Sequence, residues 1–276
     1  MSEITLMGSG NWSEPINFVK MYSDGTPMVK TDQWLDIVAR ADTMVLRPHS
    51  LNSFVTAMFL VDAITLAGGR IQRLVLPYVP GARQDRTNPT GDVLFTIESV
   101  TRMINQRRFS RVVILDPHSH ATSIRLQNVR IFPQSEVAKK LWQGYSGIIS
   151  ADKGGKERAE AMAEAMDLPV TYGGKTRDVS TGKLTGFTLD ELPVKGGHYL
   201  VVDDICDGGG TFIGLAEKIR EQGAYADLFV SHGIFSKGTA ELKKVYKNIY
   251  TTDSRQVHER NDVLTVELLN EMRNYG

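Results

Sequence analysis

Short runs of aliphatic and β-branched residues recur along the chain, and most are followed by a segment with helical spacing of apolar residues. The clearest runs end in polar or glycine-rich loops and predict strands at 74–78, 112–116, 147–150 and 199–203. The helical spacing predicts helices at 53–67, 94–104, 156–166 and 212–222. Gly223 ends the last of them as a C-cap residue would. This alternation is typical of an α/β fold with mostly parallel sheets flanked by helices.

The strand and helix pattern runs twice along the chain, with residues 131–134 as the expected crossover between the two passes. No linker rich in Gly, Ser or Pro separates the passes, so we expect two domains that pack together. The predicted domains are residues 1–137 and 138–276, and the last helix can pack back on the N-terminal half.

Composition narrows the classes of partner. The chain has 276 residues, 41% hydrophobic and 23% charged, which is typical of a folded protein. Its net charge is zero, which argues against broad electrostatic binding to nucleic acid or to an anionic membrane. No apolar run reaches the roughly 20 residues that a membrane span needs, and no signal peptide is visible. Cys206 is the only cysteine, so no internal disulfide is possible and a cytoplasmic location is expected.

The strongest chemical signal is the segment 201–212, where a buried strand ends in Asp203 and Asp204 and then turns through glycines into a helix. Glycines and a helix N-terminus can bind a phosphate through backbone N–H groups. The two carboxylates can accept hydrogen bonds from the paired hydroxyls of a ribose. The segment therefore predicts a site for a phosphorylated sugar. The alternative is a plain tight turn in which Asp207 caps the helix.

The polar stretch 172–186 holds four glycines, three threonines and a serine where a compact α/β domain usually has a short connection. We expect a long polar loop that acts as a lid over a site. A surface hairpin without function is the alternative.

Several motifs in order along the chain resemble those of the ribose-phosphate pyrophosphokinase family, which makes phosphoribosyl diphosphate. The matching segments are Pro77-Tyr78, Ala82 to Arg86, Leu115 to His118, Ser150 to Gly155, Asp203 to Thr211, His232 to Ser236 and Thr251 to Asp253. The resemblance implies two phosphoribosyltransferase-like domains and a homo-oligomer built from dimers, commonly a hexamer. It also implies transfer of the β,γ-diphosphate of ATP to the 1-hydroxyl of ribose 5-phosphate, with Mg²⁺, releasing AMP.

The resemblance assigns roles to individual residues. Lys175 and Arg177 match the catalytic pair on the family's flexible loop, and a spacing of two on an extended hairpin points both side chains to one face. The residues of the sugar-phosphate site are Asp152, Asp203, Asp204, Asp207, Gly208, Gly209, Gly210 and Thr211.

On the ATP side the resemblance implies contacts from Tyr22, Asp24, Arg83, Gln84 and His118. His118 and Asp152 are the candidate Mg²⁺ contacts, and because Mg²⁺ prefers oxygen ligands, the histidine is expected to act through phosphate oxygens and water. Asp85 and Arg86 can instead form a structural ion pair beside this group.

Three positions depart from the family pattern. Thr26 replaces a glutamate of the adenine-binding motif, Lys153 replaces a small residue after Asp152, and Gly208 replaces a threonine of the phosphate loop. A glycine at this position lacks the threonine hydroxyl that would donate to the 5-phosphate, and it opens space beside that phosphate. This change suggests an altered acceptor. ADP-ribose is one such acceptor, and its product, ADP-ribose pyrophosphate, would be a donor for NAD resynthesis. Ribose 5-phosphate remains slightly favoured.

Two other readings of the chain are less favoured. An inactive regulatory homologue would not need the intact set Lys175, Arg177, Asp203, Asp204 and His118. A phosphoribosyltransferase would share the fold and the acidic loop, but it has no reason to contain the segments 82–86 and 115–118.

Overall fold

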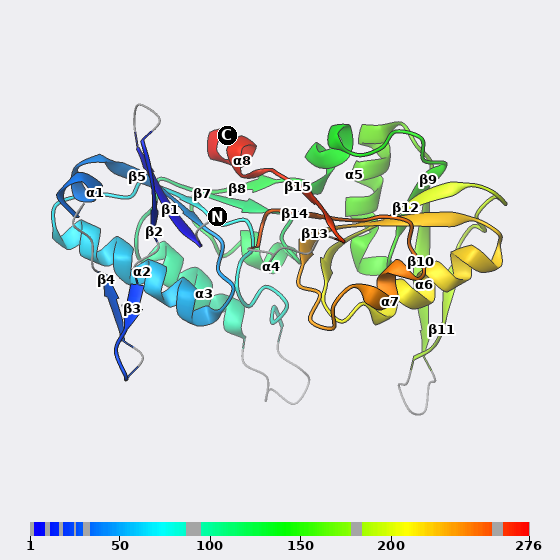
Figure 1. The fold of residues 1–276 in the computed structure, drawn as a ribbon, viewed down its shortest axis with the longest axis horizontal. Coiled ribbons are helices and arrows are strands. Elements are labelled where there is room, and N and C mark those ends of the chain that lie inside the picture. Colours follow the sequence, from blue (N-terminus) through cyan, green and yellow to red (C-terminus); the bar gives the residue numbers. More distant parts are fainter. Residues whose placement is uncertain are drawn as a thin grey trace. The chain divides into compact units, whose positions relative to one another are not determined.

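The computed structural model describes residues 3–8, 12–16, 19–24, 26–29, 34–86, 95–177, 184–255 and 262–275. The chain divides into two compact units (Figure 1). Unit 1 consists of Met1–Phe132, Ser254–Gln256 and Leu268–Gly276, so it contains both ends of the chain. Unit 2 consists of Pro133–Asp253 and Val257–Glu267. No helix within the described ranges is long and apolar enough to cross a membrane.

Unit 1 is built on a six-stranded sheet in the order β2-β1-β5-β6-β7-β8. Its strands are β1 (Ile4–Gly8), β2 (Ser13–Ile16), β5 (Ala41–Leu46), β6 (Arg73–Val75), β7 (Arg111–Leu115) and β8 (Val129–Phe132). The strands β5 to β8 are parallel, and β1 runs antiparallel to both of its neighbours. A separate two-stranded sheet pairs β3 (Val19–Met21) with β4 (Pro27–Val29).

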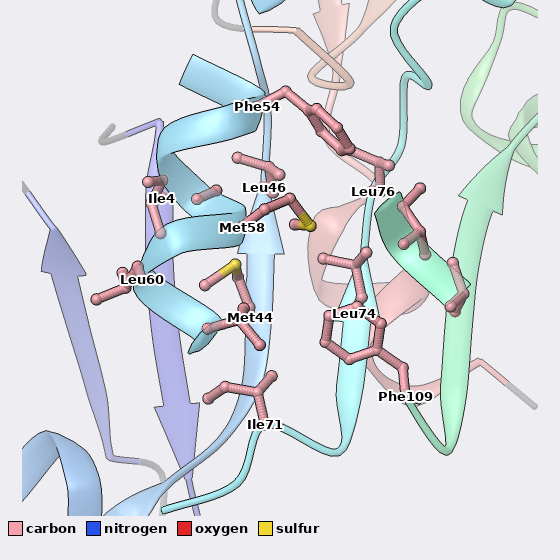
Figure 2. Packing of buried hydrophobic residues seen from close by; sticks show 14 of the residues in the cluster. Ile4, Met44, Leu46, Phe54, Met58, Leu60, Ile71, Leu74, Leu76 and Phe109 are labelled. Carbon is pink, nitrogen blue, oxygen red and sulfur yellow. The ribbon is translucent and has the colours of Figure 1, made fainter. Parts of the chain in front are cut away.

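The helices of unit 1 are α1 (Trp34–Arg40), α2 (Leu51–Leu66), α3 (Thr96–Asn105), α4 (His120–Ser123) and α8 (Leu269–Asn274). Helix α2 begins after Ser50, which forms a capping box with Ser53. Its apolar side chains pack on the sheet. Figure 2 shows Phe54 and Met58 pointing toward side chains from β5 and β6. Burial of this apolar face is the main stabilising term for the helix.

Unit 2 has a seven-stranded sheet in the order β11-β10-β9-β12-β13-β14-β15. Its strands are β9 (Gly147–Ser150), β10 (Val170–Arg177), β11 (Leu184–Leu189), β12 (His198–Cys206), β13 (Tyr225–Gly233), β14 (Ile249–Thr252) and β15 (Leu264–Val266). All neighbours are parallel except β10 and β11. The helices are η1 (Gln134–Lys140), η2 (Lys153–Gly155), α5 (Lys156–Met166), α6 (Gly210–Glu221) and α7 (Ala240–Lys243).

The predicted α/β class with two mostly parallel sheets is confirmed, and several element ends differ from the prediction by one to three residues. Strand β12 continues to Cys206, three residues past the predicted end, because it stays paired with β13 as far as Gly233. Strand β6 ends at Val75 rather than at residue 78, since Pro77 has no N–H to donate to the ladder. Helix α6 begins at Gly210, two residues earlier than predicted.

Part of the polar stretch 172–186 is regular structure rather than loop. Residues up to Arg177 continue β10, and they pair antiparallel with β11, so the described part of the stretch is a hairpin. The backbone of β10 passes very close to β9 at Gly173, where a Cβ atom would lie 2.7 Å from the carbonyl oxygen of Ser150. Only glycine fits at this crossing. Residues 178–183, at the tip of the expected lid, lie outside the described residues.

Candidate active site

The turn between β12 and α6 has the geometry of an anion site. Gly209 is the N-cap residue of α6 and has φ of +79°, a conformation that favours glycine. The N-cap position is thus occupied by Gly209 and not by Asp207. The N–H groups of the first helical turn have no partner within the helix, and the helix dipole adds positive potential at the same end. Backbone groups here can bind a phosphate.

The acidic pair lies on the last part of β12. The side chains of Asp203 and Asp204 are only 14% and 7% exposed. The N–H of Asp204 donates to Oδ1 of Asp203 over 2.8 Å, which fixes the orientation of the first carboxylate. Burial, reinforced by the charge of Asp204, raises the pKa of Asp203 well above its ordinary value.

Arg158 of α5 faces this pair and was not identified from the sequence. Its Nη1 lies 3.4 Å from Oδ1 of Asp203 and 4.0 Å from Oδ1 of Asp204. The guanidinium opposes the rise in the pKa of Asp203. Gly155 lies beside this contact, since a Cβ atom there would be at ordinary van der Waals distance from both groups, 3.5 Å from Asp203 Oδ1 and 3.6 Å from Arg158 Nη1.

Two more polar groups of unit 2 belong to this neighbourhood. Asp152 follows β9, caps η2 by accepting a 2.9 Å hydrogen bond from the N–H of Gly154, and contributes its charge to the raised pKa of Asp203. Gln134, also missed from the sequence, donates through Nε2 to the carbonyl of Asp203 over 2.6 Å. The carboxyl ends of β9 and β12 therefore gather the predicted sugar-phosphate residues at one edge of a parallel sheet, where ligands of open α/β folds bind.

The residues Lys175 and Arg177 lie two positions apart on β10, opposite Phe187 and Leu184 of β11. The hairpin contacts α6 through Phe187. A Cβ atom on Gly214 would lie 2.0 Å from Cε2 of that ring, so the ring packs directly on the helix backbone. Helix α6 thus joins the phosphate turn at its N-terminus to the hairpin that carries the two cations.

In unit 1 the structure brings Asp85 close to His118. Burial acts to raise the pKa of Asp85, but the neighbouring Ser119 side chain and the charges of Arg86 and His118 together lower it. Arg86 also forms an exposed ion pair with Asp85 at 3.3 Å. The ion pair between Asp85 and Arg86 that the sequence offered as an alternative is therefore present, and Asp85 also lies close to His118.

The other predicted ATP contacts of unit 1 are solvent-exposed. Arg83 and Gln84 lie on the surface of the turn after β6, and the hydroxyl of Thr96 donates to the side chain of Gln84. Tyr78, of the same turn, is covered by the guanidinium of Arg255, 4.7 Å from the ring centroid. Arg255 adds a cation beside the predicted motif, and no sequence pattern singled it out.

Tyr22 and Asp24 lie at the turn between β3 and β4. Tyr22 is 55% exposed, so its ring face is open to a stacking partner. Asp24 accepts from the side chain and from the backbone N–H of Thr26, the latter over 2.9 Å, and these bonds lower the pKa of Asp24. The threonine that replaces the family's glutamate therefore holds Asp24 in place.

The predicted metal contacts His118 and Asp152 belong to different units. Within the described ranges, no group of three His, Cys, Asp or Glu side chains is arranged to hold a metal ion by itself. The carboxylates of Asp152, Asp203 and Asp204 still present the oxygen donors that Mg²⁺ prefers, and Mg²⁺ commonly takes most of its ligands from phosphates and water.

The fold is of the phosphoribosyltransferase type. The family model described as phosphoribosyl transferase domain matches residues 134–267, most of unit 2. The fold is that of a phosphoribosylpyrophosphate synthetase from Mycobacterium smegmatis, with a TM-score of 0.79 at 20% identity over 93% of this chain and 87% of the other.

Sequence relatives extend the match to both units. The chain is 30% identical over 268 residues to the ribose-phosphate pyrophosphokinase of Pyrococcus furiosus, covering 91% of this chain and 90% of the relative. It is 31% identical over 246 residues to that of Pyrococcus abyssi, covering 86% and 83%. The chain therefore belongs to the ribose-phosphate pyrophosphokinase family, and it is an enzyme of the diphosphotransferase class.

Proposed function

We propose that the protein transfers the β,γ-diphosphate of ATP to the 1-hydroxyl of ribose 5-phosphate and releases AMP. The observation that carries this proposal is the arrangement on β12 and α6, where a buried acidic pair precedes a helix N-terminus that begins at a glycine turn. The carboxylates suit the sugar hydroxyls, and the helix end suits the 5-phosphate. Family membership supports the same reaction.

The sugar is bound by Asp203 and Asp204 through its 2- and 3-hydroxyls, while the backbone from Asp207 to Thr211 binds its 5-phosphate. The positive charge of Arg158 partly offsets the negative charges of Asp203 and Asp204, which reduces the repulsion between the two carboxylates. This holds the 1-hydroxyl in one orientation for an in-line attack on the β-phosphorus of ATP.

Lys175 and Arg177 stabilise the negative charge that spreads over the transferred diphosphate, because cations placed in advance lower the barrier of such a displacement. A covalent route through the only cysteine is disfavoured, since burial raises the pKa of Cys206 to about 12 and keeps the thiol neutral.

ATP is bound through Arg83 and Gln84 at its phosphates, and through Tyr22 and Asp24 at its adenine, with the tyrosine ring as the stacking face. His118 and Asp152 are the proposed Mg²⁺ contacts. When bound, Mg²⁺ supplies positive charge to the phosphate oxygens. We also propose that the protein forms a homo-oligomer built from dimers. Light scattering tests this, because it gives the molar mass of the protein in solution.

ADP-ribose is the second candidate acceptor. The observation that favours it is Gly208, which lacks the threonine side chain and has only the flexible stem of Lys237 beside it, so a 5-phosphate that continues into a pyrophosphate bridge meets no rigid obstruction there. The product would be ADP-ribose pyrophosphate, an activated donor for NAD resynthesis.

Release of AMP from ATP with Mg²⁺ tests these acceptors, with ribose 5-phosphate and ADP-ribose compared side by side and each product identified by mass. Turnover with ribose 5-phosphate supports the first proposal, and turnover with ADP-ribose alone replaces it by the second. Absence of AMP with both acceptors would leave the inactive regulatory homologue, which the intact set of site residues argues against.

A further inference from the structure

The loop after β13 is fastened to the phosphate turn by backbone hydrogen bonds. The N–H of Ser236 donates to the carbonyl of Asp207 over 3.1 Å. The N–H groups of Ile234 and Phe235 both donate to the carbonyl of Cys206, over 2.9 and 3.0 Å. Residues 236 and 237 are therefore held directly beside residues 207 and 208.

The position of this loop is further fixed by close packing. Phe235 is 1% exposed and adopts φ of +47°, which costs a side-chain-bearing residue energy and persists only where the surroundings demand it. Its ring lies on Gly233, where a Cβ atom would be 2.2 Å from Cε2. On the other side, Leu242 of α7 packs 3.3 Å from the Cβ position of Gly209.

Lys237 extends from this loop along Gly208. A Cβ atom on Gly208 would lie 3.5 Å from Cε of Lys237 and 3.6 Å from its Cδ, so the aliphatic stem runs in van der Waals contact beside the turn. The space that loss of the threonine side chain leaves is therefore lined by a lysine stem. The ammonium group is one bond beyond Cε, and the side chain is exposed.

We propose that Lys237 is a phosphate-binding residue of this site, in which its ammonium takes over from the hydroxyl that Gly208 lacks. The inference rests on the proposed function and concerns the phosphate attached to the 5-oxygen of the ribose. A lysine is a flexible point charge with three donors, so it can follow either a terminal phosphate or one that continues into a pyrophosphate bridge. Charge-assisted hydrogen bonds to phosphate are among the strong ones.

The same side of the turn thus carries a cation that the backbone site alone would not supply. Arg158 is engaged with the acidic pair, so it does not serve this phosphate. Lys237 instead sets how tightly the 5-phosphate is held, whichever acceptor carries it.

Lys195 offers a matched control. It is an exposed lysine whose stem also runs along a glycine, with Cγ 3.2 Å from the Cβ position of Gly223, but Gly223 follows the opposite end of α6. The variant Lys195→Met removes the same charge and the same kind of contact away from the phosphate turn.

The experiment is calorimetric titration of the full chain with ribose 5-phosphate and, separately, with ADP-ribose. We expect Lys237→Met to raise the Kd of ribose 5-phosphate about 10-fold, and Lys237→Arg to stay within about threefold of the parent. Raising NaCl should shrink the difference between parent and Lys237→Met, because the lost interaction is between charges. Lys195→Met should bind like the parent.

Equal Kd values for Lys237→Met and the parent with both acceptors would overturn the inference. An equal loss of affinity in Lys195→Met would also overturn it, because the effect would then come from the overall charge of the protein and not from a contact with the phosphate. AMP release separates this from the proposed function. If the parent turns over and Lys237→Met has the same KM for the sugar phosphate, the proposed function stands and Lys237 has no role in phosphate binding. If binding of the sugar phosphate depends on Lys237 but the parent releases no AMP, Lys237 keeps its binding role and the proposed function is wrong.

Discussion

The guanidinium of Arg158 lies 3.4 Å from Oδ1 of Asp203 and 4.0 Å from Oδ1 of Asp204, so one cation from α5 serves two adjacent carboxylates of β12. The three side chains are nearly buried, with 11%, 14% and 7% exposure. Two carboxylates this close repel each other, and burial adds to the penalty. The positive charge of Arg158 offsets this repulsion and so helps to hold both carboxylates near the end of β12.

Replacement of Arg158 by Met should therefore shift the pH dependence of the reaction. The pKa of Asp203 is raised by burial and by Asp204 and is opposed by Arg158, so it rises further without the guanidinium. We expect the acidic limb of kcat/KM to move to higher pH, with a loss of about 10- to 100-fold near neutral pH. Arg158→Lys should recover part of the loss. An acidic limb at the same pH in both variants would contradict this role.

Asp203→Asn should stabilise the free protein while it impairs sugar binding. A carboxyl with a raised folded pKa holds its proton more tightly in the folded state, so stability falls as pH rises above the unfolded pKa of about 3.9. The amide removes that penalty without removing the acceptor for the N–H of Asp204. We expect a gain of about 0.5–2 kcal/mol near neutral pH and none near pH 4, measured by thermal unfolding without ligands. A gain that is equal at both pH values would contradict the titration argument.

The strand, acidic pair, glycine turn and helix were predictable from sequence because they are contiguous: the apolar run, Asp203, Asp204 and the glycines occupy one short segment. The contacts that complete the site were not. Arg158 reaches the pair from α5 and Gln134 from η1, 45 and 69 residues away from Asp203. Nothing in the local pattern of either residue distinguishes it from an ordinary helix-surface side chain.

Lys237 illustrates the same limit in another way. The sequence showed that Gly208 lacks a threonine side chain and suggested open space, but the stem of Lys237 lies beside that position. This placement depends on the left-handed Phe235 and on hydrogen bonds from the loop to Cys206 and Asp207. Local propensity does not report such tertiary contacts.

Asp227 supports unit 2 at the opposite edge of the sheet from the site. It is fully buried and accepts from the hydroxyl of Tyr145 over 2.7 Å and from the N–H of Asn248 over 3.0 Å, and it contacts His198 Nε2 at 3.0 Å. Asp227→Asn replaces one acceptor oxygen by a donor, which leaves these partners mismatched.

We expect Asp227→Asn to lower the free energy of unfolding by about 1–3 kcal/mol, measured by urea denaturation. The KM values for ATP and the sugar should stay unchanged below the melting temperature, because β12 and β13 begin at this edge and end at the other. A specific change in sugar KM without loss of stability would argue against a purely structural role.

Lys175→Ala should depress turnover far more than ATP binding. The hairpin that carries Lys175 is anchored on α6 by Phe187 at Gly214, so the backbone stays in place when the side chain is shortened. A cation needed mainly for charge in the transition state affects kcat more than KM. We expect kcat to fall about 100- to 1,000-fold with a change in the KM of ATP below about threefold. A loss confined to KM would contradict the catalytic role.

Gly208→Thr tests whether the phosphate turn selects the acceptor. Gly208 has no left-handed φ, and the new Cβ atom would meet only the flexible stem of Lys237 at 3.5 Å, so the chain should fold normally. The hydroxyl supplies a phosphate donor and the methyl group fills space beside the turn. We expect the ratio of kcat/KM for ribose 5-phosphate over ADP-ribose to rise about 10-fold or more.

The double variant Gly208→Thr/Lys237→Met gives the sharper result, because two groups that serve the same phosphate should not act additively. If the threonine hydroxyl replaces the ammonium, Lys237→Met should weaken ribose 5-phosphate binding clearly less in the Gly208→Thr background than in the parent. Strictly additive effects would mean that the two positions act on the ligand independently, and an unchanged acceptor ratio in Gly208→Thr would show that selection lies outside this turn.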